Sequence, residues 1–410
     1  MFKMRLPNRV VYLWLPVILL AAILWTTPAR AATPAWHGEI KKLAGKGAVL
    51  VTEPGKGTLY SLHADKKMMP ASVQKIITAA AALDYLGPNY RFVTEFYVTP
   101  EDDLIVIGRG DPFLVSEELN YIGGMLAGSG LRHVRHIYLD NTFFQPNLVL
   151  DGTERSLNPY DAYNGALCAN FNTIFAVIDK SGRVESAEPQ TPITDLGREL
   201  ALKTGARGKT RFNLAEHPET CLIYAGDLIK AFLTKNGIRV TGELKPQPMV
   251  LDRARLIYRH QSRMNLAELL TQLLKYSNNF MTNQIFLTLG AEKYGPPADA
   301  AKARRAVNDY LKGLGLSGFH IEEGSGLSRK NQVTASQLMT VLDRFTPYQD
   351  LLPMEEGALV KTGTLSDVKS LAGYMIRGSG RTVPFVILLN GRYRTNTRVK
   401  ILEILESNIP

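Results

Sequence analysis

The stretch Pro70-Ala71-Ser72-Val73-Gln74-Lys75 opens an alanine-rich run that continues to Leu83 and is followed by Gly87-Pro88. Proline at the start and glycine after the end are typical of a helix, so we predict one over residues 71–83. Ser72 and Lys75 form a Ser-x-x-Lys sequence at its N-terminus, where backbone N–H groups and the helix dipole stabilise a developing oxyanion. A lysine three residues later shares the serine's helix face and can take its proton once burial or a neighbouring cation lowers the lysine pKa.

This four-residue pattern also has a plainer explanation and a second occurrence. Ser72 could be an N-cap residue followed by a surface lysine. A second Ser-x-x-Lys, Ser366–Lys369, follows a turn and runs into a predicted strand. Because only Ser72 begins an apolar helix, it is the stronger candidate for a nucleophile, with Lys75 as its base.

Ser277-Asn278-Asn279 is a Ser-x-Asn sequence directly after an apolar helical pattern. The hydroxyl of Ser277 could relay a proton toward a leaving amine, and the amide of Asn279 could hold a substrate carbonyl or orient Lys75. Taken alone, the sequence is also typical of a loop cap.

Lys361-Thr362-Gly363-Thr364 lies at the entry to a predicted strand. An edge strand can pair with an extended peptide, while the lysine ammonium and the threonine hydroxyls would meet a terminal carboxylate. Gly363 would let the backbone pass close to the serine. A second Lys-Thr-Gly, Lys203-Thr204-Gly205, has no strand pattern after it, which favours Lys361.

Around these motifs the sequence predicts an α+β chain of several domains. Strands are expected at both ends and helices in the middle, so one domain is split by an insertion. We expect a catalytic domain made of residues 32–90 and 257–410, interrupted by a β-rich region, residues 91–256. The predicted strands are residues 48–52, 58–62, 357–361, 370–376 and 383–390, and the further helices are residues 266–275, 300–314 and 397–405.

The first residues have the three-part layout of a secretory signal peptide. A basic start precedes an apolar run from Val10 to Trp25, and Ala29-Arg30-Ala31 is a small-x-small cleavage site. The run is shorter than the about 20 residues that span a bilayer, although an uncleaved anchor is the alternative. We expect residues 1–31 to be removed after Ala31 and the chain to act in the periplasm.

Composition restricts the function further. The chain of 410 residues is 45% hydrophobic and 21% charged, as in ordinary globular proteins, and its formal net charge is +10. The basic residues form no long block, so nucleic-acid binding has no support, although peripheral association with membrane or cell wall is compatible with the charge.

The seven histidines show no metal-ligand spacing, and no metal is expected. Cys168 and Cys221 could pair in an oxidising compartment or stay as buried thiols.

The three motifs, in this order, are the signature set of penicillin-recognising serine enzymes. The chain resembles the class C low-molecular-mass penicillin-binding proteins, the D-Ala-D-Ala carboxypeptidase/endopeptidase family, over nearly its whole mature length. Glu323 and Asn278 stand where that family commonly has aspartate. Besides Pro70–Lys75, the resemblance is carried by Gly108-Arg-Gly-Asp-Pro112, Leu139-Asp-Asn-Thr-Phe-Phe144, Gly324-Ser-Gly-Leu-Ser-Arg329 and the long gap between Ser72 and Ser277.

The resemblance implies a serine β-lactamase-like transpeptidase fold, with an antiparallel sheet and helices interrupted by the β-rich insertion. It implies that Ser72 attacks the carbonyl between two D-alanines, with Lys75 as base and the backbone N–H groups of Ser72 and Thr364 as oxyanion hole. Ser277, Asn279 and Lys361 complete the expected catalytic set, and Thr362, Gly363 and Thr364 the substrate and oxyanion contacts. Peptidoglycan peptides are the implied substrates and β-lactams the implied covalent inhibitors, with no cofactor.

Two other functions remain open at this stage. A serine β-lactamase or esterase on the same fold would share the motifs, although the long gap between Ser72 and Ser277 disfavours a β-lactamase. A non-catalytic wall-binding protein would need only the insertion, and the intact motif residues argue against it.

Overall fold

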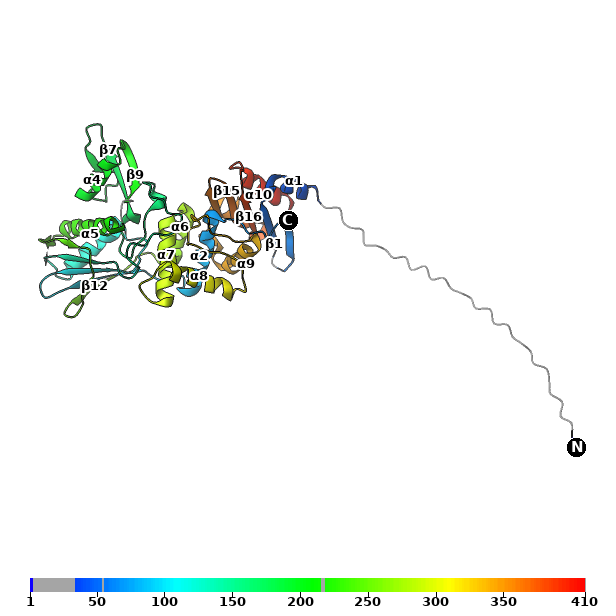
Figure 1. The fold of residues 1–410 in the computed structure, drawn as a ribbon, viewed down its shortest axis with the longest axis horizontal. Helices are drawn as coiled ribbons and strands as arrows, with labels where there is room; N and C mark the ends of the chain where they lie inside the picture. The colour runs from blue at the N-terminus through cyan, green and yellow to red at the C-terminus, as the bar shows by residue number, and fades with distance from the viewer. Residues whose placement is uncertain (3–33, 54, 215–217, 410) are drawn as a thin grey trace.

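The computed structural model describes residues 1–2, 34–53, 55–214 and 218–409. The expected signal peptide, residues 1–31, therefore lies outside the described residues apart from its first two. Within the part of the chain that is described, no helix combines the length and the apolar character needed to cross a bilayer. The molecule is elongated, and helices α6 (Leu266–Tyr276) and α7 (Asn279–Tyr294) lie between its two ends (Figure 1).

A six-stranded antiparallel sheet forms one end of the molecule, in the order β13-β14-β15-β16-β1-β2. Side chains alternate between its two faces, as strand geometry requires. In β1, Val49 and Val51 pack in the same cluster as α1 and α10, whereas Ala48 and Leu50 pack with the central helices. The strands are β13 (Met354–Glu355), β14 (Ala358–Leu365), β15 (Val368–Ile376), β16 (Thr382–Asn390), β1 (Ala48–Glu53) and β2 (Gly57–Leu62), and the helices are α1 (Ala35–Ala44) and α10 (Thr397–Asn408).

The central helix of the molecule is α2 (Gln74–Tyr85), which contacts α6, α7, α8 (Ala300–Gly313) and α9 (Ala335–Phe345). It is buried from Gln74 to Leu83, which is why small alanines suit it. The helix predicted over residues 71–83 starts as an α-helix only at Gln74. Residues Ala71–Val73 form a 3₁₀ turn, η1, before it. The helix ends before Gly87, whose φ of 81° fits the left-handed conformation that follows many helices.

Residues between α2 and α6 build three further sheets, and one hydrophobic cluster contains side chains from all three. The smallest of them pairs β10 (Arg239–Val240) with β5 (His133–Val134). The insertion also contains helices α3 (Ser116–Gly128), α4 (Asp195–Lys203) and α5 (Pro218–Lys235), which the expectation of a β-rich region did not include. Cys168 and Cys221 are buried free thiols in this structure. The five-stranded sheet runs β11 (Leu244–Lys245), β6 (Ile137–Asp140), β4 (Leu104–Gly108), β3 (Val93–Val98) and β12 (Arg255–Gln261), and the three-stranded sheet runs β8 (Val184–Ser186), β7 (Thr173–Ile178) and β9 (Gly208–Asn213).

The C-terminal end of the insertion follows from strand pairing. β12 pairs with β3 over residues 255–261 and so crosses the boundary expected between residues 256 and 257. We therefore propose that the insertion extends to Gln261, where the chain leaves this sheet and continues to α6. The expected division into domains otherwise stays a prediction.

Candidate active site

Ser72 lies in the tight turn that precedes α2, with its backbone closely surrounded. Ala71 has a φ of +49°, a left-handed conformation that is strained for a residue with a side chain. A Cβ atom built on Gly363 of β14 would lie 2.8 Å from the Pro70 carbonyl oxygen and 3.1 Å from the Ser72 nitrogen. A Cβ atom on Gly326, whose φ is +84°, would overlap the Ala71 carbonyl. Glycine is therefore required at both positions for β14 and the loop that contains Gly326 to close around the serine.

Lys75 is fully buried one helical turn beyond Ser72. Its ammonium nitrogen Nζ lies 3.0 Å from Ser72 Oγ, 2.7 Å from Asn279 Oδ1 and 2.8 Å from the Ser325 carbonyl oxygen. The three partners come from three separate segments of the chain, so the fold rather than the local sequence fixes the position of the lysine nitrogen.

Burial is the main reason why the pKa of Lys75 is well below its ordinary value, because a charged ammonium loses its hydration. The positive charge of Lys361 lowers this pKa further, whereas the carboxylate of Glu323 opposes the shift. The environment thus favours the neutral amine, which is the form that can accept a proton.

The Ser-x-Asn segment joins α6 to α7. Ser277 ends α6 in a left-handed conformation with a φ of +54°, and Asn278 caps α7 by accepting a hydrogen bond from the Met281 backbone N–H at 3.0 Å. Asn279 then begins α7 and directs its amide oxygen to Lys75. Its amide nitrogen lies 3.4 Å from the Tyr160 carbonyl oxygen, a contact that orients the amide. Ser277 lines the adjoining groove.

Strand β14 contains Lys361, whose positive charge acts on Lys75. Lys361 is 2% exposed, and burial together with the charge of Arg398 lowers its pKa to about 8, against the opposing effect of Glu355. Its Nζ donates to the Thr362 carbonyl oxygen at 3.0 Å. This environment leaves Lys361 largely charged at neutral pH.

One edge of β14 is open beside Ser72. On that side β13 pairs only with Ala358 and Leu359, and the Val360 N–H donates to the Pro353 carbonyl at 2.9 Å. Backbone groups alternate in direction along a strand, so the N–H of Thr364 points to the same side as that of Val360. No strand among the described residues pairs with Thr362 and Thr364 at this edge. The edge can therefore receive an extended peptide.

Three residues of the site were not identified as site residues from the sequence. Arg398 of α10 donates to the Gly363 carbonyl oxygen at 2.8 Å and to Thr364 Oγ1 at 3.1 Å, which holds β14 in place. The Glu323 carboxylate accepts hydrogen bonds from Ser325, and the Tyr160 carbonyl oxygen contacts the Asn279 amide nitrogen. None of the three belongs to a local motif with Ser72, and only the departure from aspartate at position 323 drew attention to that residue.

A groove of about 640 Å³ begins at Ser277 and Asn279 and runs toward the insertion. Phe113, Phe171 and Tyr276 give it apolar walls, and Arg211, paired with Glu188 at 2.5 Å, lies along it. Its lining includes Ser277 and Asn279 but not Ser72 or Lys75, so the groove adjoins the nucleophile rather than containing it.

A model of the D-Ala-D-Ala carboxypeptidase 3 (S13) family matches residues 41–198, 204–356 and 352–406 of this chain. The chain belongs to this family, which confirms the resemblance inferred from the motifs and the enzyme class that it implied. A D-alanyl-D-alanine carboxypeptidase from an Actinomadura species is 29% identical over 87% of this chain and 79% of its own length.

Solved structures confirm the expected fold class. Penicillin binding protein 4 (dacB) from Haemophilus influenzae superimposes with a TM-score of 0.76 at 21% identity, covering 91% of this chain and 99% of that one. The same protein in complex with a β-lactam superimposes with a TM-score of 0.69 at 22% identity and the same coverage.

Proposed function

We propose that this chain cleaves D-alanyl-D-alanine bonds of peptidoglycan stem peptides through an acyl-enzyme on Ser72, as a carboxypeptidase, an endopeptidase or both. One observation carries the assignment of the nucleophile: the buried Lys75 Nζ lies 3.0 Å from Ser72 Oγ. A lysine whose pKa is lowered by burial is a suitable base for a serine hydroxyl.

In the proposed reaction, neutral Lys75 accepts the hydroxyl proton of Ser72 while Oγ attacks the carbonyl carbon between the two D-alanines. The backbone N–H groups of Ser72 and Thr364 stabilise the oxyanion of the tetrahedral intermediate. Ser277 and Lys361 help to move this proton from Lys75 to the leaving D-alanine amine as the peptide bond breaks, which leaves Lys75 neutral again. Water then hydrolyses the ester and restores the serine hydroxyl.

The edge of β14 and Lys361 are assigned to substrate binding. The open edge of β14 pairs with the substrate backbone, and the charge of Lys361 attracts its terminal carboxylate. The same groups receive the carboxylate of a β-lactam, which acylates Ser72. The basic and apolar start of the chain supports export to the periplasm with cleavage after Ala31.

Release of free D-alanine from a synthetic stem pentapeptide tests this function. The wild type releases one D-alanine per peptide, and Ser72→Ala releases none while its thermal unfolding is unchanged. A cross-linked muropeptide dimer, supplied in parallel, separates carboxypeptidase from endopeptidase activity. A folded wild type that attacks neither substrate contradicts the proposal, and rapid turnover of a β-lactam by that protein would indicate a β-lactamase instead.

A further inference from the structure

The three partners of Lys75 differ in what they can offer to its nitrogen. Asn279 Oδ1 and the Ser325 carbonyl oxygen only accept hydrogen bonds, whereas the Ser72 hydroxyl both accepts and donates. A neutral amine has two N–H bonds and one lone pair. With its two N–H bonds directed to the two acceptors, its lone pair faces Ser72 Oγ. The Ser325 carbonyl, at 2.8 Å, therefore helps to aim the base at the nucleophile.

The direction of the Ser325 carbonyl is determined by the peptide unit that it shares with the N–H of Gly326. In a planar trans peptide these two groups point in opposite directions. The Gly326 N–H donates to Glu323 Oε1 at 2.7 Å, so the carbonyl on the other side is directed to Lys75.

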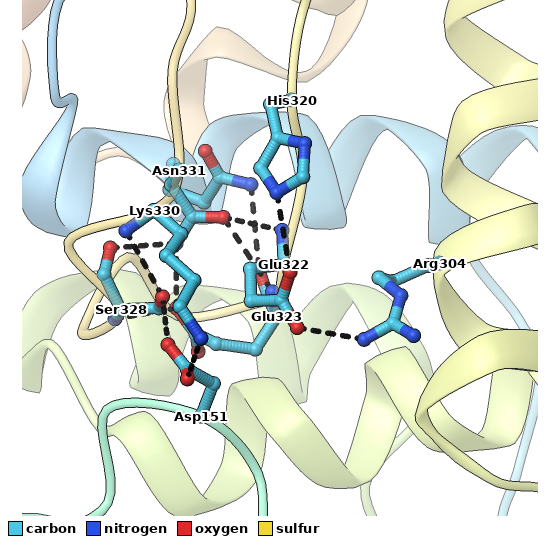
Figure 2. A network of polar contacts seen from close by, with 9 residues as sticks. Asp151, Arg304, His320, Glu322, Glu323, Ser328, Lys330 and Asn331 are labelled. Carbon is cyan, nitrogen blue, oxygen red and sulfur yellow. Dashed lines mark hydrogen bonds and ion pairs between the residues drawn. The ribbon is translucent and has the colours of Figure 1, made fainter.

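Glu323 is fully buried, and its carboxylate is surrounded by donors from the 324–331 loop (Figure 2). Oε2 accepts from the Ser325 N–H at 2.7 Å and from Ser325 Oγ at 2.6 Å. Besides Gly326, Oε1 accepts from the Ser328 N–H at 3.2 Å and from Asn331 Nδ2 at 2.8 Å. Hydrogen bonds to a buried carboxylate are strong, so this side chain holds the part of the loop that contains the peptide between Ser325 and Gly326.

We propose that Glu323 is a positioning residue that holds the Ser325 carbonyl against Lys75, so that the lone pair of the neutral amine faces Ser72. The proposal rests on the function proposed above. It assigns to Glu323 two separable effects, one on the orientation of the base through hydrogen bonds and one on its charge state through the negative charge.

The same loop is held from outside by a second carboxylate, which provides a matched control. Asp151 accepts hydrogen bonds from Ser328 Oγ and, at 2.6 Å, from Lys330 Nζ (Figure 2). These contacts lie at the far part of the loop and leave the peptide between Ser325 and Gly326 untouched. Asp151→Asn therefore loosens the loop without altering the support of Lys75.

The experiment measures the second-order rate of acylation by a fluorescent penicillin as a function of pH in Glu323→Gln, Glu323→Asp and Asp151→Asn. In Glu323→Gln the amide nitrogen faces backbone donors, so the maximal rate falls by about 10- to 100-fold. Loss of the negative charge also moves the acid limb, where Lys75 must lose its proton, to lower pH. Glu323→Asp keeps the charge and restores most of the rate with an unmoved limb, and Asp151→Asn stays within about twofold of the wild type.

A folded Glu323→Gln variant with the wild-type rate and the wild-type acid limb overturns the proposal. Equal losses in all three variants with no shift of the limb also overturn it, because they indicate general loosening of the loop. If Glu323→Gln does not fold, Ser325→Ala replaces it, since it removes one donor to Glu323; a several-fold loss supports the proposal and an unchanged rate overturns it. A wild type that is not acylated contradicts the proposed function itself, a result distinct from these.

Discussion

The chain contains the Ser-x-x-Lys pattern twice, at Ser72–Lys75 and at Ser366–Lys369, and the two copies have different geometries. In the first, the serine precedes a buried helix and the lysine nitrogen turns back to its hydroxyl at 3.0 Å. In the second, the serine lies in the turn between β14 and β15, and Lys369 Nζ donates to the Leu365 carbonyl oxygen at 3.2 Å. The exposed Ser366 hydroxyl accepts from Arg329 instead.

The comparison shows that the Ser-x-x-Lys spacing brings the serine and the lysine together only when the motif lies on a helix. Residues three apart on a helix share a face, whereas the side chains of a strand alternate between two faces. Burial adds the second requirement. Lys75 lies between α2, α7 and the 324–331 loop, where loss of hydration lowers its pKa, whereas Ser366 of the second copy is exposed.

The largest expected effect is on the acylation rate, and it distinguishes Lys75 from Lys369. Lys75→Ala removes the proposed base, so the acylation rate at neutral pH falls by about 100- to 10,000-fold while the protein stays folded. Lys369→Met keeps the bulk of the side chain and removes its hydrogen bond to the Leu365 carbonyl oxygen, and its rate stays close to that of the wild type. Stopped-flow acylation by a fluorescent penicillin measures both. Rapid acylation of Lys75→Ala would remove the assignment of the base.

A smaller effect separates the two Lys-Thr-Gly sequences. Gly363→Ala places a methyl group 2.8 Å from the Pro70 carbonyl oxygen, and the resulting displacement of β14 lowers the acylation rate by about 10-fold or more. Gly205, in the other copy, has open space around it but a φ of +66°. Gly205→Ala therefore lowers the free energy of unfolding by about 1 kcal/mol without changing acylation. Chemical denaturation and rate measurements on both variants test this contrast; similar acylation rates would show that β14 tolerates the methyl group.

The pH profile of acylation sharpens the roles of the two cations in the site. Activity rises with pH as Lys75 loses its proton, and it falls above about pH 8 as Lys361, whose pKa is about 8, loses its charge. Lys361→Arg keeps a cation at high pH, so the alkaline limb disappears. Lys361→Met removes a charge that lowers the Lys75 pKa, so the acid limb moves to higher pH. An alkaline limb that is unchanged in Lys361→Arg would show that another group controls it.

The smallest effect concerns the support of β14. Arg398→Lys retains the positive charge, but its ammonium does not reproduce the position of Nη1, the nitrogen that contacts both the Gly363 carbonyl oxygen and Thr364 Oγ1. We expect the acylation rate to fall by about threefold to 10-fold with little change in the melting temperature. A rate equal to that of the wild type would show that β14 keeps its position without this contact.

The sequence predicted the parts of this site that depend on local patterns. The helix after Pro70, the strand containing Lys361 and the hairpins at the end of the chain follow from residue periodicity and turn residues, and the structure contains them. The contact of Lys75 with Asn279 joins residues 204 positions apart. The Ser-x-Asn motif offered it as one of two roles for Asn279, and residue periodicity alone does not encode it. Neither the inward-facing carboxylate of Glu323 nor the reach of Arg398 from the last helix has a short-range signal. The helices of the insertion were missed because its many glycines, prolines and asparagines indicated strands and turns.

Mapping the site of acylation most directly tests the claim that helix context and burial select one serine. The wild-type protein is reacted with benzylpenicillin, digested and analysed by mass spectrometry, with Ser72→Ala and Ser366→Ala treated in parallel. We predict a single penicilloyl adduct on the peptide that contains Ser72, present in Ser366→Ala and absent from Ser72→Ala. An adduct on the peptide that contains Ser366, or one that persists in Ser72→Ala, would contradict this account.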